Sequence, residues 1–380
     1  LERMVTVMVI TCPHALGLAI PLVVAVSTSL SARSGLLIRD RSAFERAREL
    51  DAVVFDKTGT LTEGRFGVTD VISLGDRDER ELLGLAAALE SQSEHPIAQG
   101  IVARAREEGV DIRAPRRFRA IPGKGAQATI GEHEVKVVSP GYLKEHGLEA
   151  PGDEVRRVAE EGKTVVYVLV DERPAGALAL ADIIRRESRE ALAGLKAMGV
   201  QVMMLTGDSG AVARWVAREL ELDDYFAEVL PDQKAAKIKE VKGRNLRVAM
   251  VGDGVNDAPA LVEADVGIAI GAGTDVAIES ADIVLVRSDP RDVTAILELA
   301  RATYRKMVQN LLWATGYNAV AIPLAAGVLY FAGIVLSPAV GAALMSASTV
   351  IVAINAKLLE RARVSRGGPE GAGVPAEAAG

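Results

Sequence analysis

The stretch AVVFDKTGTLT, residues 52–62, joins an apolar run to a polar turn and decides the fold. Ala52–Phe55 is short, β-branched and apolar on both faces, which is typical of a strand buried inside a parallel sheet. Asp56 follows directly, and a carboxylate can act as a nucleophile that forms a covalent acyl phosphate. Because ligands of open α/β sheets bind beyond the carboxyl ends of the strands, we expect a reactive site at Asp56.

Further short apolar segments alternate with helical segments after residue 180, and this pattern predicts an α/β domain with a parallel sheet. The expected strands and helices are Val200–Leu205, Arg247–Val251, Val266–Ile270 and Ile283–Val286, and Arg185–Met198, Ala211–Glu219 and Asp232–Val241.

The long interval between the first and second strands predicts an inserted α+β domain at residues 65–175. Its expected strands and helices are Ala128–Ile130, Val135–Val138 and Val165–Val170, and Glu79–Leu89 and Ile97–Glu108.

Polar motifs follow the later strands as well. Thr206–Asp208 comes after the second strand and Gly252–Asp257 after the third, while Lys234 lies on the helix between them. A lysine and backbone N–H groups can take up phosphoryl charge, and carboxylates can hold Mg²⁺. A single aspartate at a strand end more often caps a helix, but the four elements in this order predict phosphoryl transfer.

Three apolar stretches lie near the ends of the chain: Met4–Leu30, about Leu311–Gly333 and about Leu336–Leu358. Each is long enough to cross a bilayer, which takes ~20 residues. None contains a charged residue except Lys357, and Arg and Lys residues cluster just outside. The positive-inside rule therefore predicts a multi-pass cell-membrane protein with cytoplasmic catalytic domains. Buried core helices of a soluble protein are the alternative.

The composition excludes some classes of protein. The net charge of −7 and the lack of a basic tract argue against a nucleic-acid partner, and the single cysteine excludes a disulfide framework. The Gly- and Pro-rich tail predicts disorder. Because the chain begins at Leu1 and runs straight into an apolar segment, we expect a fragment. The expected domains are a membrane helix at 1–34, a phosphorylation domain at 35–64 and 176–300, the insert, a helix hairpin at 303–359 and a tail at 360–380.

The first apolar stretch carries Cys12 and His14 on either side of Pro13. Proline exposes a backbone carbonyl, thiolate suits Cu(I), Ag(I) or Zn(II), and imidazole suits copper and zinc. Polar residues inside a membrane usually have a function, so both are expected to bind an ion. Pro21 predicts a second kink without a ligand, and Gln309 and Asn310 are expected at the membrane interface on the cytoplasmic side. Further candidate ligands, with helix packing as the alternative, are Asn318, Met345, Ser346 and Thr349.

The motifs D-K-T-G-T-L-T, T-G-D and G-D-G-V-N-D-A-P-A-L resemble those of the P-type ATPases, which are members of the haloacid dehalogenase-like superfamily. The resemblance implies that Asp56 accepts the γ-phosphate of ATP. It implies Mg²⁺ ligands at Asp56, the Thr58 carbonyl and Asp253. The residues implied to act in catalysis are Asp56, Lys57, Thr58, Thr206, Gly207, Asp208, Lys234, Asn256 and Asp257.

Thr58 separates a pump from a phosphatase. Soluble phosphatases of this superfamily usually carry a second aspartate two residues after the nucleophile, and here that residue is threonine. The actuator motif T-G-E of the pumps is absent from this sequence. The chain therefore resembles the C-terminal part of a pump, with the actuator domain in a missing N-terminal part.

The insert contains Ser93–Pro96 and Gly123–Gly125, which resemble the nucleotide-binding domain of heavy-metal P-type ATPases. Taken alone, His-Pro is more often structural, and two glycines equally suit a hairpin. Ser139-Pro140 departs from the family pattern at the edge of the pocket. The resemblance implies ATP contacts at Glu90, Glu94, His95, Gly123 and Gly125.

Cys-Pro-His resembles the variant of the heavy-metal pumps associated with copper and silver. The resemblance implies ATP-driven export of copper or silver, with a metallochaperone as a candidate partner. Three alternatives stay open: a zinc or cobalt pump, a membrane-tethered phosphatase, and a transport-incompetent, non-catalytic fragment.

Overall fold

The computed structural model describes residues 2–11, 14–148, 152–253, 255–271, 275–334 and 336–361. The chain divides into two compact units. The first unit comprises Leu1–Val53, Ala191–Val200 and Ala235–Gly380, and the second comprises Val54–Glu190 and Gln201–Lys234. The domain boundaries expected from the sequence stay predictions.

A seven-stranded sheet contains the strand that ends in Asp56. Its order is β1-β13-β12-β11-β2-β9-β10, and its strands are parallel in the pairs β11/β12, β12/β13 and β9/β10, whereas β1 runs antiparallel to β13. The bounds are β1 Leu36–Ile38, β2 Ala52–Asp56, β9 Gln201–Leu205, β10 Asp224–Phe226, β11 Val248–Gly252, β12 Val266–Ile270 and β13 Ile283–Leu285. The five predicted strands and the α/β class are confirmed. The short edge strands β1 and β10 were not predicted.

Helices lie between these strands in the sequence. They are α4 Arg41–Arg46, α9 Arg186–Ala197, α10 Gly210–Glu219, α11 Lys234–Lys242, α12 Ala258–Glu263 and α13 Asp275–Ser280. The three helices predicted between strands are confirmed as α9, α10 and α11, with ends that differ from the predicted ones by at most two residues.

The second unit contains a six-stranded antiparallel sheet of order β3-β8-β7-β6-β5-β4. Helices α5 (Glu79–Glu90) and α6 (Pro96–Glu107) pack on it around an apolar cluster that includes Leu83, Ile101 and Val168. Two further helices are α7 Pro140–Glu145 and α8 Asp153–Glu160. The strands are β3 Thr62–Ser73, β4 Arg116–Ile121, β5 Gly125–Ile130, β6 His133–Val138, β7 Thr164–Val170 and β8 Arg173–Ile184.

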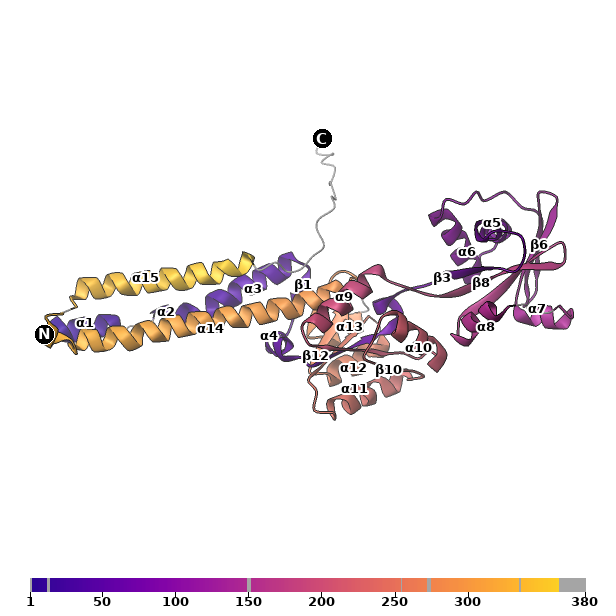
Figure 1. Cartoon of the computed structure of the whole chain (residues 1–380). Helices are drawn as coiled ribbons and strands as arrows, with labels where there is room; N and C mark the ends of the chain where they lie inside the picture. Colours follow the sequence, from indigo (N-terminus) through magenta and orange to yellow (C-terminus); the bar gives the residue numbers. More distant parts are fainter. Residues whose placement is uncertain are drawn as a thin grey trace, which may run out of the picture. The chain divides into compact units, whose positions relative to one another are not determined.

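Strands β3 and β8 position the insert. They pair from Thr62 with Ile184 to Ser73 with Gly176, and so extend beyond the predicted insert at both ends (Figure 1). Neither strand was predicted, because both interrupt their apolar runs with polar or small residues.

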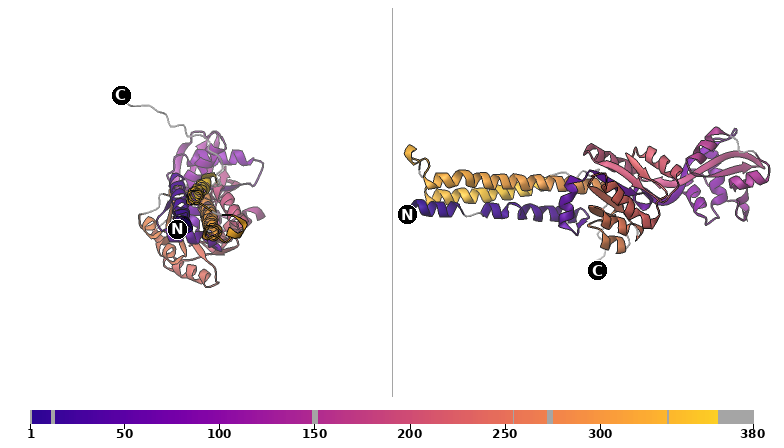
Figure 2. Two further views of the ribbon diagram at one scale, coloured as in Figure 1. Left: turned by 90° about the vertical axis from the view of Figure 1, so that its left-hand side faces the viewer. Right: turned by 90° about the horizontal axis from the view of Figure 1, so that it is seen from below.

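The long apolar helices of the first unit, from the two ends of the chain, lie side by side (Figures 1 and 2). By length and composition, Arg3–Arg33 and Pro338–Glu360 could each cross a membrane. Within these stretches, the helices are α1 Glu2–Ile10, α2 His14–Ala19, α3 Pro21–Arg33 and α15 Pro338–Lys357. The break before Pro21 agrees with the predicted kink. Cys12, Pro13 and residues 362–380 of the predicted tail lie outside the described residues.

The predicted span Leu311–Gly333 differs from the structure. Helix α14 begins at Arg291 and ends at Ala326, so the apolar half continues directly from a charged half. Gly327 ends the helix with a left-handed φ of 92°, which glycine adopts without steric cost. Over its described residues, helix α14 does not pass the length and composition test for a membrane span.

Candidate active site

Asp56 lies at the carboxyl end of β2 and is almost fully buried, with 6% of its surface exposed. The Nζ of Lys234, on the first residue of α11, forms an ion pair with Asp56 Oδ1. Lys234 is itself 7% exposed. A buried carboxylate is costly without such a partner. The same ammonium group is placed to neutralise an anionic group that reacts at Asp56.

Lys57 points into a pair of carboxylates. Its Nζ lies 2.8 Å from Asp208 Oδ2 and 3.1 Å from Asp182 Oδ2. Burial lowers the pKa of Lys57, but the hydrogen bond and charge of Asp208, with those of Asp182, outweigh it and raise the pKa overall. Lys57 therefore stays charged at neutral pH and ties the T-G-D loop to the D-K-T turn.

Asp182 was not predicted as a site residue. It lies near the end of β8 and also accepts a hydrogen bond of 2.6 Å from Thr62 Oγ1. Its signal in the sequence is one carboxylate that follows an apolar run, Ala177–Ala181. A single carboxylate after an apolar run does not identify a site unless its interaction partner is known. The partner here, Lys57, is far away in the sequence.

Arg185 stabilises the turn after Asp56 by donating hydrogen bonds to its backbone. Its Nη2 donates to the Gly59 carbonyl and its Nε to the Thr62 carbonyl, both at 3.0 Å. Gly59 has a φ of +76°, a conformation that side chains disfavour. Thr58 is exposed, so it lies at the open side of this turn rather than in the core.

The T-G-D loop is closed by its own side chains. Thr206 Oγ1 donates to Asp208 Oδ2 at 3.0 Å and accepts from the Asp208 N–H at 3.1 Å. A Cβ added to Gly207 would meet its nearest atom, the Val229 carbonyl oxygen, at an ordinary 3.6 Å. Packing therefore does not require glycine at 207, and its backbone can be approached by a ligand.

In the first unit, the G-D-G-V-N-D segment follows β11. Asp253 is half-buried, Asn256 is exposed and Asp257 is only 2% exposed. A Cβ on Gly252 would lie 2.5 Å from Asp257 Oδ2, so this glycine is needed for the carboxylate to pack there. Gly254 lies outside the described residues.

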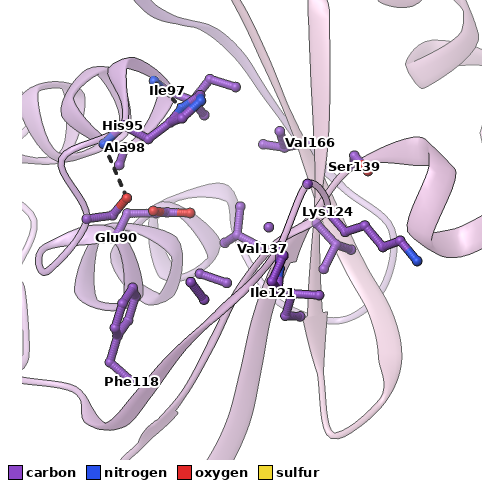
Figure 3. A pocket seen from close by; sticks show the side chains of 17 residues that line it. Glu90, His95, Ile97, Ala98, Phe118, Ile121, Lys124, Val137, Ser139 and Val166 are labelled. Atoms are coloured by element: carbon purple, nitrogen blue, oxygen red, sulfur yellow. Dashed lines mark hydrogen bonds between the residues drawn. The ribbon is translucent and has the colours of Figure 1, made fainter.

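The second unit contains a pocket of about 400 Å³ in the insert (Figure 3). Its walls are largely apolar, with Glu90 and His95 on one side and Lys124 and Ser139 on the other. Four of the five predicted nucleotide residues line it. Glu94 does not belong to its lining. The apolar lining includes Ile97, Phe118, Ile121, Val137 and Val166.

The polar residues of this pocket have distinct roles. Burial raises the pKa of Glu90 to about 7, although a hydrogen bond with Ser93 lowers it. His95 caps helix α6, because its Nδ1 accepts the Ile97 N–H at 3.3 Å. That bond leaves Nε2 to carry the proton of a neutral ring and to donate to a ligand.

Two glycines shape the opposite side of the pocket. Gly125 has a φ of +142°, and a Cβ there would lie 2.0 Å from the Val137 carbonyl oxygen. Gly123 has a φ of +70° with nothing within 4 Å. Lys124 between them forms an ion pair with Glu145. The pair of glycines therefore serves two purposes, a tight strand contact at 125 and an open surface at 123.

Apart from Cys12, which lies outside the described residues, the candidate ion ligands lie on helices of the first unit. His14 is exposed at the start of α2, and Asn318 and Met345 are half-buried on α14 and α15. Ser346 donates to the Ala342 carbonyl at 3.0 Å, and Thr349 to the Met345 carbonyl at 3.1 Å, so both hydroxyls bond back to their own helix.

Three buried hydroxyls on α14 and α15 have no hydrogen-bond partner among the described residues. Thr303 Oγ1 lies in the charged half of α14, whereas Tyr317 Oη and Ser348 Oγ lie on the apolar half of α14 and on α15. Tyr317 and Ser348 directly precede the candidate ligands Asn318 and Thr349 in the sequence. An unpaired buried hydroxyl is costly, so both are candidates to face a bound ion or water.

Comparison with known proteins defines the class. Residues 50–265 match the family model of haloacid dehalogenase-like hydrolases, and the chain belongs to this family. It is 67% identical over 359 residues to the copper-exporting P-type ATPase B of Archaeoglobus fulgidus. The aligned region covers 94% of this chain and 52% of that protein. It is 46% identical over 361 residues to the copper-exporting P-type ATPase B of Enterococcus hirae, with 95% and 48% covered.

Solved structures agree with this relationship. A zinc-transporting PIB-type ATPase in its E2.Pi state matches with a TM-score of 0.73 and 35% identity, over 93% of this chain and 57% of that one. The similarity to heavy-metal P-type ATPases therefore extends over almost the whole chain. The chain spans about half the length of the curated relatives it matches.

Proposed function

We propose that this chain is the phosphorylated and ion-conducting part of a membrane pump that exports a soft cation, copper or silver, at the expense of ATP. The observation that carries the proposal is the buried Asp56–Lys234 pair at the end of β2, bordered by an exposed Thr58. Relatives named as copper exporters support the choice of cargo.

The proposed chemistry begins at Asp56. One carboxylate oxygen attacks the γ-phosphorus of ATP, a P–O bond forms, and the bond to the ADP oxygen breaks. Lys234 and the backbone of the T-G-D loop stabilise the charge on the transferred group. Because Thr58 cannot act as a general base, water attack on the acyl phosphate is slow. The intermediate can then persist for a conformational change of the pump.

The carboxylates suit a magnesium ion. The resemblance of their motifs to those of the P-type ATPases supports Asp56 and Asp253 as proposed ligands, because oxygen donors are what Mg²⁺ prefers. The Thr58 carbonyl is a further proposed ligand. When bound, Mg²⁺ would neutralise phosphate charge near Asp56. Lys57, paired with Asp208, keeps the adjoining loop in place.

We assign the pocket of the insert to the base and sugar of ATP. Phe118 and the aliphatic lining offer apolar surface to a planar ring, and Glu90 can accept a hydrogen bond from an exocyclic amine. His95 can donate through Nε2. The similarity to the P-type ATPases supports ATP as the nucleotide.

The pH dependence of ATP binding tests the assignment of Glu90. Because its pKa is raised to about 7, Glu90 is mostly neutral at pH 6 and mostly ionised at pH 8 in the empty pocket. An amine donates more strongly to the ionised form, so ATP affinity should rise by about fivefold from pH 6 to pH 7. Isothermal titration of the chain measures this affinity at each pH.

Glu90→Gln is the matched control for that titration, because its amide does not titrate while ATP titrates equally in both experiments. The variant should keep only the shallower dependence that comes from the nucleotide. Equal slopes for the two proteins would remove Glu90 from the base-binding site.

For the cargo site, we propose Cys12 and His14 as the principal ligands. Met345 adds a soft thioether, and Asn318, Ser346 and Thr349 are the harder candidates. Tyr317 and Ser348 join the set because their buried hydroxyls have no partner among the described residues.

We place α1, α2, α3, α15 and the apolar half of α14 in the cell membrane and both catalytic regions in the cytoplasm. The apolar stretches Arg3–Arg33 and Pro338–Glu360 support a multi-pass arrangement. A metallochaperone that delivers the ion is the proposed partner, and nucleic acid is not.

A metal panel tests the cargo. ATP hydrolysis by the protein in membranes should be stimulated by Cu(I) and Ag(I) more than by Zn(II) or Co(II). Cys12→Ser should reduce stimulation by Cu(I) at least tenfold, because it removes the soft thiolate. Stimulation by Zn(II) alone would favour the zinc or cobalt alternative, and full copper stimulation of Cys12→Ser would remove Cys12 from the site.

A further inference from the structure

A chain of side-chain hydrogen bonds crosses three helices of the first unit at the point where α2 ends. Asn310 of α14 donates through Nδ2 to the carbonyl of Ala19 at 3.0 Å and to that of Val352 at 3.3 Å. Its Oδ1 accepts from Asn355 Nδ2 at 2.8 Å. Lys306 Nζ then donates to Asn355 Oδ1 at 2.8 Å.

Asn310 is buried against the neighbouring helices, with 1% of its surface exposed. Its expected place at the membrane interface stays a prediction. Ala15 and Ala19 of α2 and Ala314 of α14 form an apolar cluster with Val352 of α15, and two of its members, Ala19 and Val352, supply the carbonyls that Asn310 contacts. Such small residues let helix backbones approach closely. The sequence could not show this, because the closeness of α2 and α15 decides whether an amide on α14 is buried.

The two acceptors of Asn310 Nδ2 are backbone carbonyls on different helices. Apolar side chains can slide along a neighbouring helix at little cost, whereas a hydrogen bond to one particular carbonyl fixes the axial position. Ala19 is the last residue of α2, immediately before the break at Ile20 and Pro21. Asn310 therefore holds the broken first stretch, α14 and α15 in one register.

These three helices carry the proposed cargo ligands other than Cys12, which lies outside the described residues. His14 begins α2, Asn318 lies on α14 about two turns beyond Asn310, and Met345 lies on α15 about two turns before Val352. A change of register between the helices would separate the ligand atoms. A soft cation such as Cu(I) is held by few ligands, so its binding requires that these ligand atoms lie close to one another.

We infer that Asn310 is a positioning residue of the transport site: its amide sets the register of α2 and α15 against α14, and thereby the affinity for a soft monovalent cation. The inference rests on the proposed function. Asn310 touches no proposed ligand in this network and acts through the helices that carry them.

Cu(I) binding by the full chain in detergent tests the inference, with bicinchoninate as the competing chelator. Asn310→Leu removes both carbonyl bonds, and Asn310→Asp keeps the shape but removes the donor. Each should weaken Cu(I) binding roughly 10- to 100-fold, the range found when groups that orient metal ligands are lost. ATP affinity of the insert and helix content by circular dichroism should be unchanged.

Two control variants separate positioning from general packing. Gln309→Leu changes the exposed neighbour on α14 and should leave Cu(I) affinity unchanged. Asn355→Ala removes the link to Lys306 but leaves both carbonyl bonds of Asn310, so its effect should stay within threefold. A full loss in Asn355→Ala would show that the link to Lys306, not the carbonyl bonds, controls affinity, and would overturn the inference.

The outcomes for the proposed function and for the inference differ. If the wild type binds Cu(I) and both Asn310 variants bind it equally well, the positioning role is overturned, whereas the proposed copper site is not. A wild-type chain that binds no Cu(I) overturns both. If Asn310→Leu does not fold, the isosteric Asn310→Asp decides alone.

Discussion

Asp56→Asn should abolish acid-stable labelling of the protein by γ-³²P-labelled ATP. The amide is a poor nucleophile, and no acyl phosphate can form on it, so labelling should fall at least about 1,000-fold. The fold should persist, because an amide oxygen can still accept a hydrogen bond from the buried Lys234. The measurement is radioactivity after acid precipitation, with and without hydroxylamine, which cleaves acyl phosphates.

Asp51→Asn is the matched control, an aspartate directly before the same strand. Asp51 accepts hydrogen bonds from the Arg247 backbone and guanidinium on an exposed part of the chain, so its loss should cost less than about 1 kcal/mol. Labelling of Asp51→Asn should match the wild type. Hydroxylamine-sensitive label in Asp56→Asn, or its absence from the wild type, would contradict the pump proposal and favour a non-catalytic fragment.

Local sequence pattern was sufficient for the parts of the site that follow strands. Asp56 comes after four buried apolar residues, and Lys234 opens a helix between two strands, so topology alone predicts that they share an edge of the sheet. The structure pairs these two side chains. Similarly, four of the five predicted nucleotide residues line one pocket.

Long-range contacts explain what the sequence pattern missed. Asp182 acquires its role from Lys57 and Thr62, which approach it only because β3 and β8 pair. The apolar stretch beginning at Leu311 looked like a separate span, yet it continues a helix that begins at Arg291. Hydropathy reports where apolar residues stop, whereas a helix ends where its backbone is capped, here at Gly327.

Gly125→Ala should disrupt the nucleotide pocket more than any other single methyl group added there. The new Cβ would lie 2.0 Å from the Val137 carbonyl oxygen, and the φ of +142° is one that side chains rarely adopt. Strands β5 and β6 would have to separate where Gly125 pairs with Val138. We expect a loss of about 3 kcal/mol in the free energy of unfolding of the insert and at least tenfold weaker ATP binding.

Gly131→Ala distinguishes this steric effect from a general intolerance of side chains at positive φ. Gly131 has a φ of +63° in the turn between the same two strands, but nothing lies within 4 Å of its added Cβ. The variant should lose only about 1 kcal/mol and keep its ATP affinity, because it lies outside the lining of the pocket. Chemical denaturation and isothermal titration of both variants make the comparison. Equal losses would mean that backbone strain, rather than the contact with Val137, governs the pocket.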